Sequence, residues 1–333
     1  MGEGKLKNIL ITGGAGYVGS ALVPSLLDKG YNVKVYDLYI YGDVFAGLKD
    51  KSQLKEVKAD IRDKKKLIEA AKGMDAIIHL ACISNDPSFE LDPELGKSIN
   101  LDAFYNVLAA AEQNKVKRLI YASTSSVYGI KEMENVSEEE TPEPITDYSK
   151  YKYECEKILS DWDADVEKVV IRPATVCGYA PRLRLDVVVN ILTINALVNK
   201  KIKIFGGPQL RPNINIKDMV RAYELLLDAP AEKVNGKTFN AGFQNYSVEK
   251  IANIVKDTIG DKNIVLEKVQ TDDTRSYHIS SEKIKKELGF EAKHTIEDAV
   301  QSLADAYKKS LLKDPMNNPL YYNIKMMQKI ELK

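Results

Sequence analysis

The chain has 333 residues, enough for one large domain or two smaller ones around a sizeable core. Hydrophobic residues make up 44% and charged residues 29% of it, a balance typical of globular proteins. Lys plus Arg and Asp plus Glu both number 48, so no bulk charge would attract nucleic acid or an anionic membrane. Because we also recognise no signal peptide and no apolar run of membrane-spanning length, we expect neither nucleic acid nor membrane as a partner.

Cysteine and histidine usage bears on the redox compartment and on metals. Cys82, Cys155 and Cys177 form no CxxC pair, and so sparse and odd a set suits a reducing cytoplasm better than a disulfide framework. The three histidines are not spaced with cysteines or carboxylates as in a zinc site. We therefore expect a cytoplasmic protein without a bound metal.

In the first half of the chain, short apolar runs alternate with segments of helical character. The expected strands are 8–12, 32–36, 54–58, 76–80, 118–122 and 167–171, and the expected helices are 16–29, 64–72, 93–114 and 148–163. Near-continuous apolar strands that alternate with helices are typical of a parallel sheet covered on both faces. The sequence therefore predicts an α/β fold with a doubly wound Rossmann sheet in residues 1–177, and a surface loop or flap at 132–144.

Beyond residue 177 the alternation loosens. Helices are expected at 185–200, 218–228, 247–258, 282–288 and 295–309, with a strand and turn at 203–208. We interpret residues 178–333 mainly as a smaller α/β lobe that completes a substrate cleft, with about 212–242 returning to the first domain. The tail from Asp314 onward gives no interpretable pattern.

Three glycines follow the first expected strand at intervals of three residues. Gly13, Gly16 and Gly19 lie between this strand and an expected helix. Without side chains, the turn lets an anion approach the helix N-terminus, where free amides and the helix dipole bind it. In this context the spacing indicates a pyrophosphate-binding turn for a dinucleotide.

Acidic residues that follow the next two strands indicate which dinucleotide it is. Asp37 comes at about the interval expected of a carboxylate that accepts hydrogen bonds from the adenosine ribose. A carboxylate there would repel a 2′-phosphate, and no Arg or Lys follows before Lys49, which favours NAD over NADP. After the third strand, Asp60 and Ile61 are expected near the adenine.

A tyrosine and a lysine four residues apart supply the expected acid–base pair. Tyr148 and Lys152 share one helix face, and a lysine beside a tyrosine stabilises the phenolate. Such a tyrosine can take the proton of an alcohol while hydride leaves the same carbon. The same spacing recurs at Tyr321 and Lys325 in the tail, where we interpret it as a solvated helix face.

Hydroxyl side chains end the strand that precedes this helix. Ser123, Thr124, Ser125 and Ser126 follow strand 118–122, at the end where doubly wound sheets bind ligands. We expect Thr124 or a neighbour to hydrogen-bond the reacting oxygen. Without the tyrosine and lysine downstream, a turn rich in Ser and Thr would be the preferred interpretation.

Further motifs follow one another in order over most of the chain: "TGGAGYVG", "YDL", "DIRD", "IIHLAC", "SINLD", "STSSVYG", "YSKYK", "IRPATVCG", "GGPQLRPNINIKDM", "FNAG" and "TRSYHISSEKIKKELGF". Together they resemble the extended short-chain dehydrogenase/reductases, in particular the NAD-dependent nucleotide-sugar epimerases and dehydratases. The resemblance implies NAD, a nucleoside diphosphate sugar as substrate, and a homodimer built from helices 93–114 and 148–163. An apolar stripe on the first of these helices supports the dimer; it comprises Phe104, Val107, Leu108 and Ala111.

The resemblance also implies roles for individual residues. The cofactor would be bound by Gly13, Gly16, Tyr17, Val18, Gly19, Asp37, Asp60, Ile61, Leu80, Ala81, Asn100, Ser123, Tyr148, Lys152 and Pro173. The catalytic set would be Thr124, Tyr148 and Lys152, and the substrate would contact Ser125, Ser126, Asn190, Arg211 and Arg275. Arginine suits a pyrophosphate because its planar guanidinium binds phosphate oxygens in pairs.

Departures from the family patterns narrow the chemistry. The 4,6-dehydratases carry Asp-Glu directly after the hydroxyl residue, and the decarboxylases tend to carry Glu at the second position, whereas this chain has Ser125 and Ser126. The fucose-synthase-like reductases use a Cys and a His near the site, and this hydroxyl loop contains neither. Cys177 stands where an aromatic residue is usual, which alters the shape of that part of the pocket.

The sequence thus predicts an enzyme that oxidises the C4 hydroxyl of a nucleoside diphosphate sugar, a hexose or heptose, with hydride passing to NAD. Return of the hydride to the other face would make it a 4-epimerase, whereas release of the keto sugar would make it a net 4-dehydrogenase, for example of the GDP-heptose type. The same residues serve both reactions. A non-catalytic module that senses NAD and an RNA-binding relative of the fold are weaker alternatives, because the Tyr-Lys pair is intact and no basic stripe exists.

Overall fold

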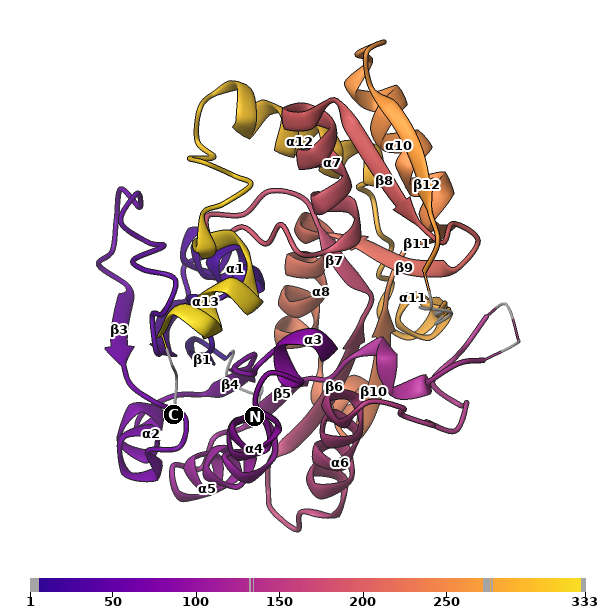
Figure 1. The fold of residues 1–333 in the computed structure, drawn as a ribbon. Coiled ribbons are helices and arrows are strands. Elements are labelled where there is room, and N and C mark those ends of the chain that lie inside the picture. The colour runs from indigo at the N-terminus through magenta and orange to yellow at the C-terminus, as the bar shows by residue number, and fades with distance from the viewer. Residues whose placement is uncertain (1–5, 132, 134, 272–275, 277, 331–333) are drawn as a thin grey trace.

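A seven-stranded parallel sheet forms the centre of the larger lobe in the computed structural model, which describes residues 6–330 except 132, 134, 272–275 and 277. The strand order is β10-β6-β5-β4-β1-β2-β3 (Figure 1). The strands are β1 (Asn8–Thr12), β2 (Asn32–Asp37), β3 (Leu54–Lys58), β4 (Ala76–His79), β5 (Arg118–Ala122), β6 (Glu167–Pro173) and β10 (Lys237–Ala241). The order reverses at β1 and β4, the kind of position where doubly wound sheets bind ligands.

Helices cover both faces of this sheet because successive strand side chains point to opposite sides. On β1, Leu10 packs in the core with α2, α5 and α6, whereas Ile9 and Ile11 pack with α1 and α8. The helices are α1 (Tyr17–Asp28), α2 (Lys64–Ala71), α5 (Phe104–Gln113), α6 (Asp147–Asp161) and α8 (Ile216–Asp228). The predicted class, a doubly wound α/β Rossmann fold, is confirmed.

The smaller lobe lies at the top of Figure 1 and has its own apolar core. Strands β8 and β12 pair in parallel. Helices α7 and α10 pack on β8, and α12 packs on these two helices. The elements are α7 (Val188–Asn199), β8 (Lys201–Phe205), α10 (Val248–Ile259), β12 (Val265–Val269) and α12 (Ile296–Lys308). A three-stranded sheet adjoins this lobe and consists of β7 (Thr175–Cys177), β9 (Leu210–Asn215) and β11 (Gln244–Ser247).

The chain returns from the smaller lobe to the larger one. After β9 it forms α8, which packs against α1, then α9 (Ala231–Val234) and β10, which pairs with β6. Helix α11 (Glu282–Leu288) packs near β10. The tail returns as well, through the short turn η3 (Pro319–Tyr321) and α13 (Asn323–Ile330), which lies beside α3 (Asp86–Phe89) (Figure 1). The division into domains stays a prediction. In the structure the chain returns to the larger lobe twice, once through α8 to β10 and again through the tail.

The segment predicted as one helix over 93–114 is broken. Helix α4 (Pro93–Lys97) passes into a π-helical turn, η1 (Ser98–Asp102), before α5 begins. In this turn Asn100 accepts a hydrogen bond from the Ile83 amide at 2.8 Å and donates to the Ile83 carbonyl at 2.9 Å. The wider turn thus accompanies an amide side chain that is anchored to the loop after β4.

The apolar stripe that suggested a dimer interface covers the chain's own sheet. Phe104, Val107, Leu108 and Ala111 are each no more than 5% exposed and belong to the core. They therefore give no support for a dimer. The large apolar side chain that α5 does expose is Tyr105, at 55%.

The predicted flap at 132–144 is only partly a surface loop. Val136 is buried, and its carbonyl accepts a hydrogen bond from the Ser280 amide at 2.8 Å. The carboxylate of Glu138 accepts one from the Asn240 amide in β10 at 2.5 Å. The described part of this segment is therefore tied to the sheet.

Candidate active site

A cleft of about 560 Å³ lies at the carboxyl ends of the central strands. Its lining brings together the glycine turn, the acidic strand ends, the hydroxyl residues after β5, the Tyr-Lys pair and one arginine of β9. The predicted residues among its lining are Gly13, Gly16, Tyr17, Val18, Gly19, Asp37, Asp60, Ile61, Leu80, Ala81, Ser123, Thr124, Ser125, Ser126, Tyr148, Lys152, Pro173 and Arg211.

The turn after β1 needs glycine for steric reasons. Gly13 has a φ of +72°, and a Cβ there would lie 2.5 Å from the amide nitrogen of Ala81. A Cβ at Gly19 would lie 2.3 Å from the carbonyl oxygen of Gly14. Gly16 is the residue that precedes α1. The N-terminus of α1 therefore faces the cleft across a turn without side chains, which suits an anion.

Two carboxylates at the strand ends are held in place by hydrogen bonds. Asp37 accepts from the Ala15 amide at 3.0 Å and from the Tyr39 amide at 2.8 Å. Burial raises the pKa of Asp37, and these backbone donors oppose the shift. Burial also acts on Asp60, but its hydrogen bonds with Arg62, one of them 2.7 Å long, leave its pKa below the ordinary value.

Tyr148 stands in the first turn of α6, which a capping box anchors through Thr146. Burial raises the pKa of Tyr148, and the neighbouring Cys82 and Asp86 raise it further. Arg184 and a hydrogen bond with Thr124 lower it. The phenol is thus neutral in the resting cleft, beside a hydroxyl and a cation that both favour its deprotonated form.

Lys152 lies one turn along α6 and is almost completely buried. Its ammonium donates to the Ala122 carbonyl at 2.7 Å and lies 5.1 Å from the centroid of the Tyr121 ring. The lysine therefore sits beneath the hydroxyl residues that follow β5.

The nearby imidazole of His79 is unsuited to proton transfer. Burial, followed by the charge of Lys152, lowers the pKa of His79 to about 3. Its Nδ1 lies 2.6 Å from the hydroxyl oxygen of Thr12, and its ring packs against the rings of Phe104 and Tyr121, which also contact each other. We assign it a structural role in the sheet.

A buried polar network holds the Ser- and Thr-rich segment that follows β5. Glu156 hydrogen-bonds Ser123 and pairs with Arg172 at 2.6 Å. Arg172 also donates to the Tyr128 hydroxyl at 2.7 Å, which in turn donates to Asn240 at 2.8 Å. Because each buried charge has close partners, the network can hold this segment rigidly.

Two predicted contact residues that the structure describes, Asn100 and Asn190, do not line the cleft. Asn100 is occupied with the Ile83 backbone, as described above. Asn190 is fully buried, accepts from the Gly178 amide at 2.9 Å and donates to the Arg184 carbonyl at 2.7 Å, so it positions a loop instead of facing the cleft. Arg275 lies outside the described residues.

A loop between β7 and α7 contributes cleft residues that the motif analysis missed. Arg182, Arg184 and Asp186 all line the cleft. Arg184 pairs with Asp186 at 2.9 Å and donates to the Ser84 hydroxyl at 3.1 Å, while its Nη2 has no partner among the described residues. The run "PRLRLD", with two arginines so close to a helix start, was the available signal.

The tail is part of the cleft wall. Asn323 and Met327 of α13 line the cleft, and Asn323 is only 4% exposed. The interpretation of this segment as a solvated helix face holds for Lys325, which is exposed, but not for Asn323 and Met327. Lys325 donates to the Met316 carbonyl at 2.8 Å, so it forms no Tyr-Lys site with Tyr321.

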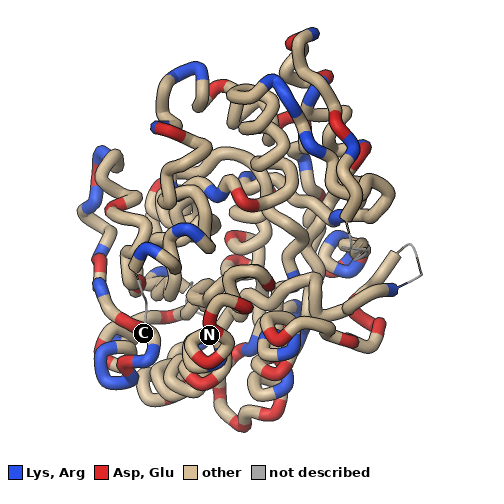
Figure 2. Tube along the Cα trace, in the orientation of Figure 1, with Lys and Arg blue, Asp and Glu red and all other residues tan. Residues whose placement is uncertain are grey.

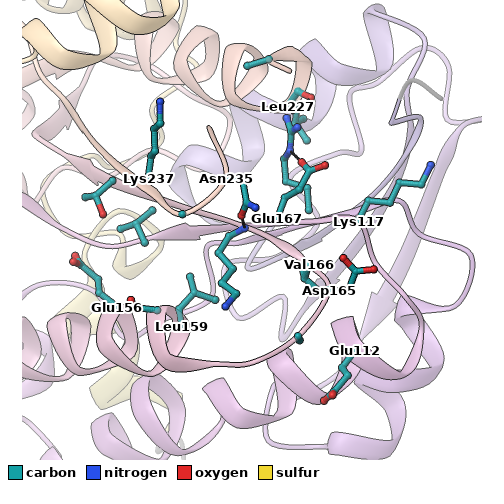
Figure 3. Close-up of a pocket in the computed structure, with 18 of the residues that line it drawn as sticks. Glu112, Lys117, Glu156, Leu159, Asp165, Val166, Glu167, Leu227, Asn235 and Lys237 are labelled. Atoms are coloured by element: carbon teal, nitrogen blue, oxygen red, sulfur yellow. Dashed lines mark hydrogen bonds and ion pairs between the residues drawn. The ribbon is translucent and has the colours of Figure 1, made fainter. Parts of the chain in front are cut away.

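A larger hollow of about 1740 Å³ opens at the opposite, amino ends of the strands (Figure 3). It is lined by residues at the amino ends of β5, β6 and β10, including Lys117, Glu167 and Lys237. None of the residues predicted to bind or react lines it. The smaller cleft is therefore the candidate site, because ligands of parallel sheets bind at the carboxyl ends.

The described residues show no sign of other classes of site. Charges of both signs are interspersed along the trace (Figure 2). Within the part of the chain that the structure describes, no group of three or more His, Cys, Asp or Glu side chains could hold a metal ion. Nor does any described helix combine the length and apolar character needed to cross a bilayer.

The fold and the cleft define a class, the Rossmann-fold enzymes in which a tyrosine, a lysine and a hydroxyl residue adjoin a dinucleotide site. The chain belongs to the NAD dependent epimerase/dehydratase family, whose sequence model matches residues 9–242.

Individual relatives extend over most of the chain. A Bacillus subtilis protein described as an uncharacterized UDP-glucose epimerase, YtcB, is 33% identical over 268 residues, 76% of this chain and 83% of that protein. The structure of UDP-glucose 4-epimerase from Thermotoga maritima with UDP-glucose is 26% identical, with a TM-score of 0.82, over 91% of this chain and 99% of that one. MoeE5 in complex with UDP-glucose and NAD is 26% identical, with a TM-score of 0.79, over the same shares.

The cofactor of the enzyme is accordingly NAD, and the cleft fits it. The glycine turn leaves a space that a Cβ would fill, and it adjoins the N-terminus of α1. Asp37 lines the same cleft at the end of β2, where a carboxylate can accept from ribose hydroxyls.

Gly13→Ala should weaken NAD binding by at least roughly tenfold, or 1.4 kcal/mol, and lower the thermal midpoint, because its Cβ would meet the Ala81 backbone. Gly73→Ala is the matched control, with a φ of +71° but nothing within 4 Å of the added Cβ. It should cost only about 1–2 kcal/mol of stability for the left-handed backbone. Calorimetric titration with NAD and thermal melts compare the two. Equal NAD affinity in both variants would contradict the role of this turn.

Proposed function

We propose that this enzyme oxidises the C4 hydroxyl of a nucleoside diphosphate sugar and returns the hydride to the opposite face, which makes it a 4-epimerase. The observation that carries the proposal is the position of Tyr148 and Thr124 in the same cleft as the glycine turn and Asp37. The UDP-glucose 4-epimerase with UDP-glucose among the related structures supports the substrate class.

Residues of this chain can be assigned to the transfer of the hydroxyl proton and to the stabilisation of the charge that it leaves. NAD, which the glycine turn and Asp37 would hold, would supply the acceptor for the C4 hydride. Tyr148 takes the hydroxyl proton, and Thr124, which hydrogen-bonds Tyr148, steadies the reacting oxygen. Lys152, buried below them, adds positive charge that favours the phenolate and can also bind the nicotinamide ribose.

The substrate half of the proposal rests on the smaller lobe. We propose that residues 1–177 bind NAD and that the lobe within 178–333 binds the nucleotide, with Arg211 of β9 and Arg275 at its phosphates. Ser125 and Ser126 line the cleft where a dehydratase needs an acid and a base. They favour a reaction in which the C6 hydroxyl is retained.

The deciding experiment is incubation of the purified enzyme with UDP-, GDP-, CDP- and dTDP-sugars, followed by NMR and mass spectrometry. We expect a C4 epimer of unchanged mass without deuterium at C4 in heavy water, because the hydride returns directly. A 4-keto product with one equivalent of NADH would assign the net 4-dehydrogenase instead. Loss of water would contradict both assignments.

Tyr148→Phe should slow reduction of bound NAD by ~10²–10⁴ in single turnover, because it removes the group that accepts the proton. NAD affinity should be nearly unchanged. In the wild type the rate should rise with pH, since burial raises the pKa of Tyr148 and the neutral phenol must lose its proton first. Tyr321→Phe, which removes the hydroxyl of the other Tyr-Lys spacing, is the control and should react normally. Wild-type rates in Tyr148→Phe would show that the base is another group.

We also propose a homodimer built from the outward faces of α5 and α6, where Tyr105 is 55% exposed. Light scattering at micromolar concentration should give twice the chain mass of 37.3 kDa. Tyr105→Glu should shift the protein towards the monomer, because it places a charge in the apolar contact. A wild-type monomer would refute the proposal.

We propose a cytoplasmic location on the basis of the thiols. Cys82, Cys155 and Cys177 are all free. Thiols without a disulfide partner are usual in a reducing compartment.

A further inference from the structure

Arg182, in the loop before α7, is buried without a full set of partners. The residue lines the cleft and is 4% exposed. Its Nη2 donates to Asn323, and its guanidinium carbon lies 3.7 Å from the centroid of the Tyr41 ring. Nε and Nη1 are out of contact with solvent and have no hydrogen-bond partner among the described residues. Neither protein nor bulk water therefore satisfies these two donors.

The electrostatic setting of Arg182 calls for an anion. Its backbone amide donates to the Ser20 hydroxyl at 3.1 Å, which places the loop beside the first turns of α1 and their partial positive charge. No described carboxylate forms an ion pair with Arg182, and Asp186 of the same loop is paired with Arg184. Burial lowers the pKa of Arg182, as expected for a cation taken out of water.

Asn323, the partner of Arg182, ties the tail to three separate segments. Its side-chain oxygen also accepts from the Tyr41 hydroxyl at 3.0 Å, and its side-chain nitrogen donates to the Ser84 hydroxyl at 2.9 Å. Its backbone amide donates to Asp186 at 2.9 Å. The first residue of α13 thus meets the loops after β2, β4 and β7 at one point on the cleft wall.

We propose that Arg182 binds the pyrophosphate of NAD beside the start of α1, and that Asn323 couples this contact to the docking of α13. A pyrophosphate supplies both the negative charge and the acceptors that Nε and Nη1 lack, in the paired geometry that suits a guanidinium. The loop and the tail then form one wall of the cofactor site. The inference rests on NAD as the cofactor and not on which sugar reacts.

The test compares two buried arginines by calorimetric titration and thermal melts of the nucleotide-free protein. Arg182→Met should weaken NAD binding roughly 10–100-fold, the scale of hydrogen bonds to a charged group, without lowering the thermal midpoint. The control is Arg118→Met. Arg118 is equally buried but is paired with Glu167 and two backbone carbonyls at the amino end of β5, away from the cleft. This change should lower the thermal midpoint and leave NAD affinity unchanged.

Other measurements exclude alternative explanations. Arg182→Gln keeps a donor for Asn323 but removes the charge, so it should weaken NAD binding as well. If Arg182→Met does not fold, this variant tests the role of Arg182 in its place. UDP serves as the second probe; loss of UDP affinity with intact NAD affinity would place the anion in the sugar nucleotide and overturn the proposal. Hydrogen exchange of α13 amides should slow on addition of NAD in the wild type and not in Arg182→Met. Unchanged NAD affinity in both neutral variants would refute the role of Arg182, whatever reaction the enzyme catalyses.

Discussion

The contact between the Gly13 turn and the backbone at Ala81 is the constraint on which the cleft depends. In a parallel sheet, β1 and β4 end side by side, and their following loops must diverge to leave room for a ligand. Gly13 donates to the Tyr36 carbonyl at 2.8 Å, which fixes the turn to the end of β2 as well. Asp37, the next residue of β2, accepts from Ala15 within the turn. One turn therefore sets the positions of the helix N-terminus and of the carboxylate together.

Much of the larger lobe could be predicted because its pattern is local. The six strands found in the sequence are short apolar runs between helices, and the structure has each of them within about two residues. β10 was missed because Lys237 and Thr238 begin it, and only Phe239–Ala241 are buried. Its place in the sheet follows from pairing with β6 almost seventy residues away, which no local pattern records. β9 was missed as well, because it contains Pro212, and a proline argues against a strand.

The site shows the same division between local and long-range information. Motif spacing located Tyr148, Thr124 and the glycines, because the residues that define each motif lie close together in the chain. It failed for Asn190, because a position in a motif does not give the direction of a side chain, and the amide faces Gly178. The contact of Asn323 with Arg182 joins residues 141 positions apart, and only the folded chain brings them together.

The reactivity of Tyr148 depends on this long-range part as well. Lys152, its expected partner, is hydrogen-bonded to the Ala122 carbonyl, whereas Arg184 is among the groups that lower the tyrosine pKa. Arg184 is held by Asp186, and Asp186 accepts from the first amide of α13. The proton affinity of the base is therefore set jointly by the helix that carries it and by a loop that the tail holds in place. A Rossmann lobe alone would supply the tyrosine, the cofactor turn and the neighbouring Asp86, but the positive charge of Arg184 comes from the part of the chain after residue 177.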